Sequence, residues 1–192
     1  MEYIVEKIGM SRTVGVPSIP VTLLKVKEVK VCSVNEDGSA YVAYADGKKA
    51  NKSIDGQQNK YELSKEFNRF MTLEVANKEA GTQDLVPLSN ASVLQIQFAT
   101  KGRGFSGVVK RHGFAGGRAS HGHRMGKRTG SIGNAEWPGR VMKGRKMPGH
   151  YGNTSNSVKN DVVSFDAENM ILVVKGSVSG ANGNLGKVKV VK

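Results

Sequence analysis

The feature that most limits how this chain can fold is a segment of 52 residues, 101–152, in its middle. The segment holds 14 of the 24 glycines and all four histidines, and neither a helical nor a strand period runs through it. Its few, scattered apolar residues cannot bury a core. We therefore expect residues 1–100 and 153–192 to form the folded body together, with residues 101–152 as an extension, which we call the arm.

Charge separates the same two parts of the chain. The whole sequence has a formal net charge of +13. Within the arm a single acid, Glu136, stands against 12 lysines and arginines, a net charge of +11, whereas all other residues together carry +2. A charge of this size concerns partners rather than fold, and the usual partner is a polyanion.

The body shows the sequence patterns of a β-protein. Apolar and polar residues alternate in several short runs, as at Leu94, Ile96 and Phe98 with glutamines between them, which is the period of a half-buried strand. Short strands with turn signals between them, such as Asp46-Gly47, are typical of a small β-barrel or sandwich. The runs lie at residues 21–33, 41–45, 93–99, 161–165, 170–175 and 187–191.

The body therefore has a mainly β fold with little helix, and the order of its strands stays open. The fourth and fifth runs flank a turn-like segment at residues 167–169 and are expected to form a hairpin, while the last run could close the sheet. Helical spacing occurs only at residues 61–71, where Leu63, Phe67 and Phe70 stand at i, i+4 and i+7.

Several classes of protein do not fit this sequence. No stretch approaches the ~18–20 apolar residues of a membrane span, and Glu2 and Glu6 at the N-terminus do not fit a signal or transit peptide. Cys32 is the only cysteine, which excludes an internal disulfide and a cysteine-based metal site. No Ser-His-Asp catalytic triad and no catalytic pair of carboxylates can be inferred from the sequence. We expect a cytoplasmic protein with no catalytic residues and no membrane partner.

The arm has the chemistry of an RNA-binding segment. Lysine and arginine neutralise phosphates, arginine also stacks on bases, and glycine lets backbone N–H groups approach phosphate oxygens. A membrane-binding segment would show an amphipathic face and a reader of duplex DNA usually a recognition helix, and neither pattern is present. The candidate RNA-binding residues are Lys101, Arg103, Lys110, Arg111, Arg118, His121, His123, Arg124, Lys127, Arg128, Arg140, Lys143, Arg145, Lys146 and His150.

Two motifs in the arm suggest other chemistry. Residues 102–107 read GRGFSG, the G-x-G-x-x-G of dinucleotide sites, but no helical pattern follows and residues 118–128 contain no acid. The four histidines have no carboxylate or thiol nearby to complete a metal site, and the surrounding cations would repel a dication. We therefore expect no metal, no cofactor and no small-molecule substrate.

Two features of the arm have more than one interpretation. The arm could be a disordered basic segment, but it is internal and punctuated by aromatic residues, which favours an extension that orders on RNA. Trp137, the single tryptophan, could be a core residue. Its place between Glu136 and Pro138, with no core to join, favours packing on RNA or on other arm residues.

The sequence resembles a known family along its whole length. About half of the chain is closely similar to the large-subunit ribosomal protein L-three family in its bacterial form, and residues 35–92 are loosely similar. The similar segments, in family order, are KIGMSR at 7–12, SIPVTLLKV at 18–26, KGRGFSGVVKRHGFAGGRASHGHR at 101–124, GSIGNAEWPGRVMKGRKMPGHYGN at 130–153 and DAENMILVVKGSVSG at 166–180.

The resemblance implies a six-stranded β-barrel of the translation-protein type with an internal extension that runs inward through rRNA. It implies a structural rather than enzymatic role in cytoplasmic ribosomes, with large-subunit (23S) rRNA near its 3′ end and neighbouring large-subunit proteins as partners, and action early in subunit assembly. The tip of the extension, residues 133–140, would approach the peptidyl transferase centre, with Asn134, Glu136 and Trp137 nearest to it.

One residue departs from the family pattern. Several bacterial members carry a methylated glutamine where this chain has Glu136, and a carboxylate cannot undergo that amide methylation. The carboxylate also places a negative charge in an RNA-lined setting, where neighbouring arginines or a metal ion would offset it. Two other functions stay open as alternatives, namely a non-ribosomal RNA chaperone or RNA-processing factor and a nucleotide-dependent enzyme that uses GRGFSG.

Overall fold

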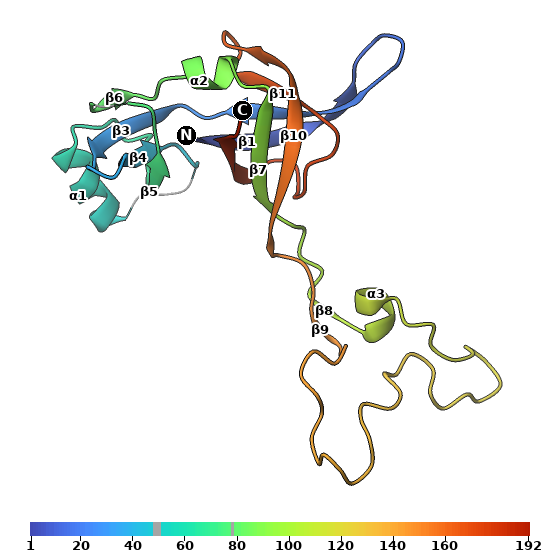
Figure 1. Cartoon of the computed structure of the whole chain (residues 1–192). Helices are drawn as coiled ribbons and strands as arrows, with labels where there is room; N and C mark the ends of the chain where they lie inside the picture. The colour runs from blue at the N-terminus through green and yellow to red at the C-terminus, as the bar shows by residue number, and fades with distance from the viewer. Residues whose placement is uncertain (48–50, 78) are drawn as a thin grey trace. The chain divides into compact units, whose positions relative to one another are not determined.

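Six antiparallel strands close into a barrel (Figure 1). Their hydrogen-bonded order is β1-β12-β7-β10-β11-β2. The computed structural model describes residues 1–47, 51–77 and 79–192. The expected six-stranded barrel is confirmed. Its strands are β1 (Glu2–Arg12), β2 (Pro20–Val26), β7 (Val93–Ala99), β10 (Ser155–Asp166), β11 (Ile171–Lys175) and β12 (Leu185–Val190).

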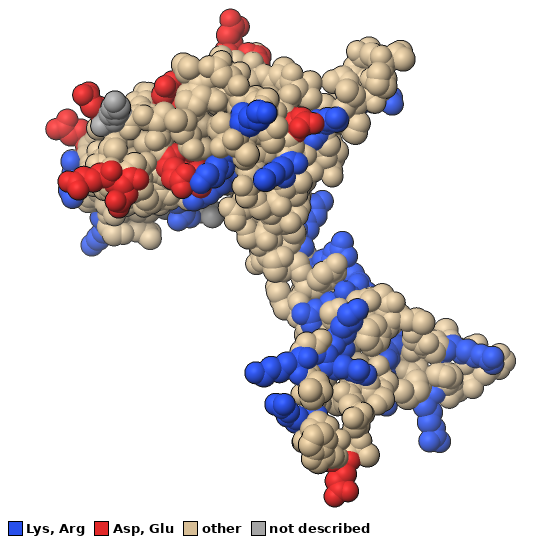
Figure 2. Space-filling view, in the orientation of Figure 1, with Lys and Arg blue, Asp and Glu red and all other residues tan. Residues whose placement is uncertain are grey.

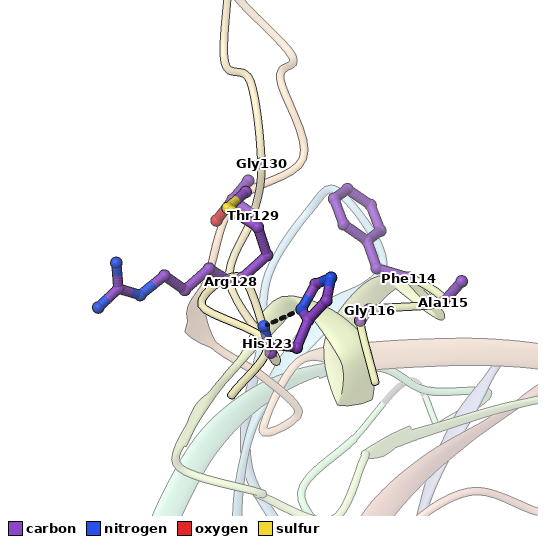
Figure 3. A pocket seen from close by; sticks show the side chains of 10 residues that line it. Phe114, Ala115, Gly116, His123, Arg128, Thr129 and Gly130 are labelled. Carbon is purple, nitrogen blue, oxygen red and sulfur yellow. Dashed lines mark hydrogen bonds between the residues drawn. The ribbon is translucent and has the colours of Figure 1, made fainter. Parts of the chain in front are cut away.

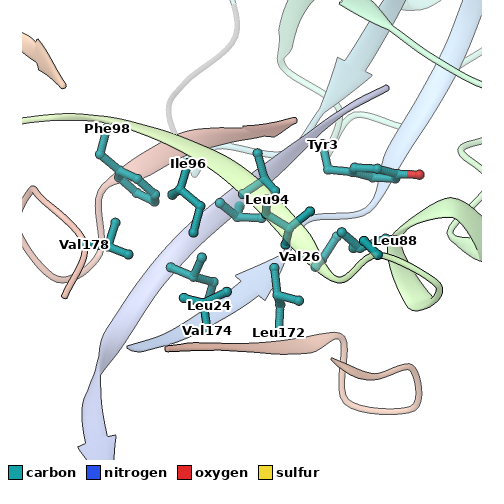
Figure 4. Packing of buried hydrophobic residues seen from close by; sticks show 13 residues of the cluster. Tyr3, Leu24, Val26, Leu88, Leu94, Ile96, Phe98, Leu172, Val174 and Val178 are labelled. Atoms are coloured by element: carbon teal, nitrogen blue, oxygen red, sulfur yellow. The ribbon is translucent and has the colours of Figure 1, made fainter. Parts of the chain in front are cut away.

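The inward-facing side chains of these strands form the main core (Figure 4). Leu94, Ile96 and Phe98 of β7 are almost fully buried, while the glutamines between them reach the outer face. Leu172 and Val174 of β11, two strands along the barrel from β7, belong to the same core. Burying one such side chain stabilises the fold by ~1.5–3 kcal/mol, so the alternation in the sequence specifies which face of each strand turns inward.

The alternation does not predict β1, although this strand pairs with both β2 and β12. Tyr3, Ile4 and Val5 are all buried. Tyr3 and Val5 belong to the barrel core, whereas Ile4 belongs to a second apolar cluster on the other side of the strand. A strand that is covered on both faces has a continuous apolar run instead of a period of two.

The second cluster packs on a separate sheet with the strand order β5-β4-β3-β6. The predicted run at residues 21–33 is two strands, one in each sheet. Its apolar phase changes between Val26 and Val29, where the chain leaves the barrel. The strands are β3 (Val29–Val34), β4 (Ser39–Tyr44), which confirms the run at 41–45, β5 (Arg69–Glu74) and β6 (Gly81–Thr82).

The prediction of a helix at residues 61–71 is wrong. Phe67 is buried beside a turn, Phe70 lies in β5 and stacks on Tyr41 at 5.6 Å between ring centroids, and Glu62 has a positive φ of 50°. The nearby helix is instead α1 (Lys52–Lys60). It has no apolar stripe to mark it in the sequence, and its buried Gln58 donates a 2.8 Å hydrogen bond to the carbonyl of Phe67.

The remaining expectations for the body are confirmed. β10 and β11 form the predicted hairpin, and the Asp166 carboxylate accepts hydrogen bonds from the backbone N–H groups of Glu168 and Asn169 in its turn. β12 closes the barrel between β1 and β7. β4 ends at Tyr44, and Gly47 has a positive φ of 44°, as a turn requires. A short helix, α2 (Val86–Ser89), precedes β7.

The chain divides into two compact units, Met1–Ala99 with Ser155–Lys192 and Thr100–Thr154. The second unit contains short regular elements that the sequence did not reveal, namely β8 (Phe105–Ser106), α3 (Val108–His112) and β9 (Gly149–His150). Ser106 and Val108 are the buried side chains of this unit. Among the described residues, no helix is long and apolar enough to cross a membrane.

Candidate nucleic-acid interface

The arm begins with a paired stem, formed by residues 100–112 and 147–154. The backbone N–H of Arg103 donates to the carbonyl of Tyr151 at 2.8 Å, and the N–H of Tyr151 donates to the carbonyl of Gly104 at 3.0 Å. β8 and β9 extend this pairing. Gly152 has a positive φ of 77°, and a Cβ there would overlap the carbonyl of Lys101. The outgoing and returning chains thus approach more closely than a side chain at this position would allow.

The short helix of the stem is tied to the returning chain through one carbonyl group. Arg111 Nη1 donates to the carbonyl oxygen of Met147 at 2.8 Å, and His112 Nε2 lies 3.1 Å from the same oxygen. Arg103 lies over the ring of Tyr151, 5.0 Å from its centroid, in a cation–π contact. Arg103 and Arg111, both predicted to bind RNA, therefore also hold the stem together.

The other cations of the arm face outward. Blue lysine and arginine side chains spread over the surface of this unit in Figure 2, and every arm cation except Arg111 is exposed. Arg145 donates to the carbonyl of Ser131. In the part of the chain that the structure describes, no hydrogen bond or ion pair holds the side chains of Lys101, Lys110, Arg118, Arg124, Lys127, Arg128, Arg140, Lys143 and Lys146.

The predicted tip lies in the distal loop, which we define as residues 113–146. Asn134, Glu136 and Trp137 are all exposed, and Trp137 has 85% of its surface free. The interpretation of Trp137 as a core residue is therefore wrong. Glu136 makes no salt bridge with any described residue, so no neighbouring arginine offsets its charge within the chain itself.

The histidines are not gathered into one site. His112 and His150 belong to the stem, whereas His121 and His123 lie in the distal loop. Across the described residues, no group of three or more His, Cys, Asp or Glu side chains could hold a metal ion.

The GRGFSG motif does not form a dinucleotide site. Contrary to expectation a helix follows it, but α3 has five residues, and β8, the strand nearest to the motif, lies within it. No acid stands about twenty residues further on. The backbone of the motif instead pairs with residues 149–151 in the stem.

Among the described residues of the body, the single cysteine is the candidate for a reactive group. Burial raises the pKa of the Cys32 thiol, which keeps it protonated and poorly nucleophilic. Some charges on the body are paired at its surface. Lys189 donates a 2.7 Å hydrogen bond to Glu74, which lowers the pKa of that carboxyl group and raises the pKa of the lysine.

A pocket of about 470 Å³ in the distal loop brings two predicted residues, His123 and Arg128, together with side chains outside the predicted set (Figure 3). The added residues include Phe114 and Thr129. They follow no helical or strand period, and their only sequence signal was an aromatic residue among glycines. Taken together, the arm presents unpaired cations, aromatic faces and accessible backbone, which can bind an anionic polymer of flat bases.

Comparison of this sequence with known proteins identifies a family to which it is similar. Residues 88–164 match the family model described as Ribosomal protein L3. The chain is 66% identical to the large ribosomal subunit protein uL3 of Wolinella succinogenes and 65% identical to that of Campylobacter jejuni, in both cases over 100% of each chain. It is 39% identical to the uL3 protein of Thermotoga petrophila, over 93% of this chain and 91% of the relative.

Proposed function

This chain belongs to the ribosomal protein L3 family, and we propose that it binds large-subunit (23S) rRNA through its arm as a structural constituent of the large ribosomal subunit. Its location is the ribosome in the cytoplasm. The observation that carries the proposal is the arm's charge, +11 in 52 residues, with nine exposed cations free of intramolecular partners. Such cations neutralise phosphates and release counterions on binding RNA.

The body and the arm have different tasks in this proposal. The barrel body contributes a rigid platform, because its core is closed. Its net charge of only +2 gives it little attraction for a polyanion. The arm enters the folded rRNA, since it is thin, rich in glycine and almost free of acids. RNA-binding residues are those predicted above, and Arg103 and Arg111 serve the stem as well.

Three finer features follow from the family resemblance and are proposed with it. The protein binds near the 3′ end of 23S rRNA, acts early in subunit assembly alongside neighbouring large-subunit proteins, and directs Asn134, Glu136 and Trp137 toward the peptidyl transferase centre. Because Asn134, Glu136 and Trp137 are exposed in the distal loop, their side chains are available for such contacts. The protein itself performs no chemistry, because the catalytic centre it approaches is RNA.

Co-sedimentation and footprinting test the proposal. We expect the protein at one copy per large subunit after a high-salt wash, and nuclease protection of 23S rRNA that is lost when residues 101–152 are deleted. Absence from washed subunits would favour a free-standing RNA chaperone or processing factor instead. Unchanged protection after the deletion would show that the arm is not the binding element.

The charge of Glu136 has its own test. We propose that this carboxylate is offset only in the RNA-bound state, by cations that the free chain does not bring to it. Glu136→Gln removes the charge and keeps the shape of the side chain. Subunit assembly and translation rates measured for this variant should differ from the natural protein, and identical rates would make the charge incidental.

A further inference from the structure

Backbone contacts between two segments of the distal loop hold the walls of its pocket together. The N–H of Gly117 donates to the carbonyl of Gly126 at 2.7 Å, which holds two segments of the loop together. Gly116 has a positive φ of 70°, and a Cβ there would lie 3.0 Å from the same carbonyl. Larger residues at these two positions would push the segments apart and open the pocket.

Two rings form the aromatic lining of this pocket. Phe114 and His123 lie along it in Figure 3. The N–H of Gly126 donates to Nδ1 of His123 at 3.3 Å, which leaves the ring proton on Nε2. A Cβ on Gly117 would overlap the His123 ring, so the glycine is required for the ring to keep its place. The pocket therefore offers an aromatic face and an N–H donor that no other residue uses.

The rim of the pocket is positively charged. Arg128 lines it, and its guanidinium extends away from the rings in Figure 3. A second cavity of about 530 Å³, lined by Lys127 and Ile132, adjoins the first and shares Arg128 and Thr129 with it. The only acid of the arm, Glu136, lines neither cavity. The ligand that fits is flat and aromatic, is joined to an anionic chain, and continues past the rim.

We propose that this pocket receives a single unstacked base of the bound RNA. The base stacks on Phe114 and accepts a hydrogen bond from Nε2 of His123, and Arg128 meets the phosphate of the same nucleotide. This inference rests on the proposed function, since it names the mode in which the arm holds RNA. Stacking of a base on an aromatic side chain tolerates any base, so the pocket recognises an unpaired position rather than a sequence.

The test combines equilibrium binding of the full chain to 23S rRNA with chemical probing of the bases. Phe114→Leu removes the aromatic face and keeps an apolar side chain of similar size. Because stacking on an aromatic side chain is worth ~1–3 kcal/mol, we expect affinity to fall about tenfold. The salt dependence should keep its slope, since no cation is removed. One unpaired base that the natural protein protects should become reactive.

Matched variants separate the pocket from the rest of the arm. Gly117→Ala should reproduce the Phe114→Leu result by displacing the His123 ring. Gly102→Ala is its control, because a Cβ there has only an ordinary contact, 3.6 Å from the Cβ of Asn153. Phe105→Leu is the control for Phe114→Leu, since Phe105 is 79% exposed and does not line the pocket. Neither control should change the protection of that base.

The outcomes distinguish this inference from the function on which it rests. Equal affinity and equal base protection for Phe114→Leu and the natural protein would overturn the pocket and leave the proposed function standing. Loss of affinity without a newly reactive base would also overturn it, because Phe114 would then only support the loop. Failure of the natural protein to bind 23S rRNA would overturn both.

Discussion

Two phenylalanines seven residues apart show how differently the two units of this protein are built. Phe98 is 2% exposed in the barrel core, whereas Phe105 is 79% exposed in the arm. The barrel buries its large side chains against one another, so its structure is stabilised by its own sequence. The arm leaves its side chains free for a partner. Burial thus indicates which unit supplies stability, and the exposure of the arm agrees with its proposed role in binding.

Charges follow the same division. In the body, Glu2 pairs with Lys187 and Asp46 with Arg69, among other surface salt bridges. No salt bridge among the described residues involves the arm, although it holds 12 cations. Exposed salt bridges contribute little to stability. The near balance of acids and bases in the body, a net charge of +2, leaves it little attraction for polyanions. The unpaired cations of the arm keep that attraction.

The largest effect is expected from removing the arm. Ala99 and Ser155 are register partners in the barrel, so a two-residue Asn-Gly turn can replace residues 100–154. The shortened chain should keep its thermal unfolding midpoint and lose 23S rRNA binding. If about half of the 12 arm cations meet phosphates, the affinity of the full chain should fall roughly a thousandfold between about 50 and 200 mM salt. Filter binding at several salt concentrations measures both the loss of RNA binding in the shortened chain and the salt dependence of the full chain.

A charge change in the body controls for net charge alone. Lys52→Gln with Lys65→Gln removes two exposed cations from the first unit and should leave the salt slope of the full chain unchanged. A steep salt dependence in the shortened chain would show that the body binds RNA too, and the division between the two units would fail.

The next effect concerns the two phenylalanines. Phe98→Ala leaves a cavity in the barrel core and should lower the free energy of unfolding by ~3–5 kcal/mol. Phe105→Ala changes an exposed side chain and should stay within about 0.5 kcal/mol of the natural protein. Urea unfolding of both variants, followed by circular dichroism, tests this matched pair. Equal losses would mean that the arm contributes to the stability of the body.

A smaller, local effect is expected in the stem. Arg111→Ala removes the hydrogen bond to the carbonyl of Met147, and a bond from a charged donor is worth ~1.5–3 kcal/mol before solvent exposure reduces it. Amide hydrogen exchange of Arg103 and Tyr151 should therefore accelerate about tenfold or more, with no change in the barrel amides. Lys110→Ala, at an exposed neighbour, is the control. Unchanged exchange in Arg111→Ala would show that the stem does not depend on this contact.

The smallest effect belongs to the body alone. Burial, with the nearby Asp84 carboxylate, raises the pKa of Tyr3 to about 12. Its ordinary pKa is about 10, so the fold favours the neutral phenol. The stability that this provides is complete below pH ~10 and is lost as the pH rises toward about 12. Tyr3→Phe should show less of this alkaline loss and should cost about 1 kcal/mol at neutral pH, because its hydrogen bond to the carbonyl of Asp84 is removed.

Urea unfolding at pH 8 and pH ~11 compares the variant with the natural protein. An equal alkaline loss in both would assign the effect to other tyrosines, such as Tyr44, whose pKa burial also raises. RNA binding at neutral pH should be the same for both proteins, since Tyr3 lies in the barrel core.

The sequence predicts strands well where one face is buried and the other is exposed. β7 and β11 follow this pattern. Prediction from this alternation fails at β1, because Ile4 is buried against a second sheet that no local sequence pattern indicates. It also fails at residues 61–71, where the spacing of Leu63, Phe67 and Phe70 is helical by coincidence. These side chains serve a turn and a strand, since tertiary packing overrides local spacing.

For the arm, composition predicts the chemistry but not the geometry. Charge and glycine content mark it as a binding segment, and that its cations meet RNA stays a prediction. The stem could not be predicted, because its links to Arg103 and Arg111 include the carbonyls of Tyr151 and Met147, and backbone groups carry no sequence signal. The distal pocket depends on positive-φ glycines whose conformation becomes visible only in three dimensions.

The pairing of β1 with β12 has a consequence for the time course of synthesis. The first strand of the barrel finds one of its two neighbours only after residue 190 has left the ribosome that makes it. Until then the barrel cannot close, and the arm has already emerged as a free polycation. Contacts so distant in sequence form slowly. For a nascent chain of this kind, an early encounter with RNA or with a chaperone would shield the arm while the barrel waits for its last strand.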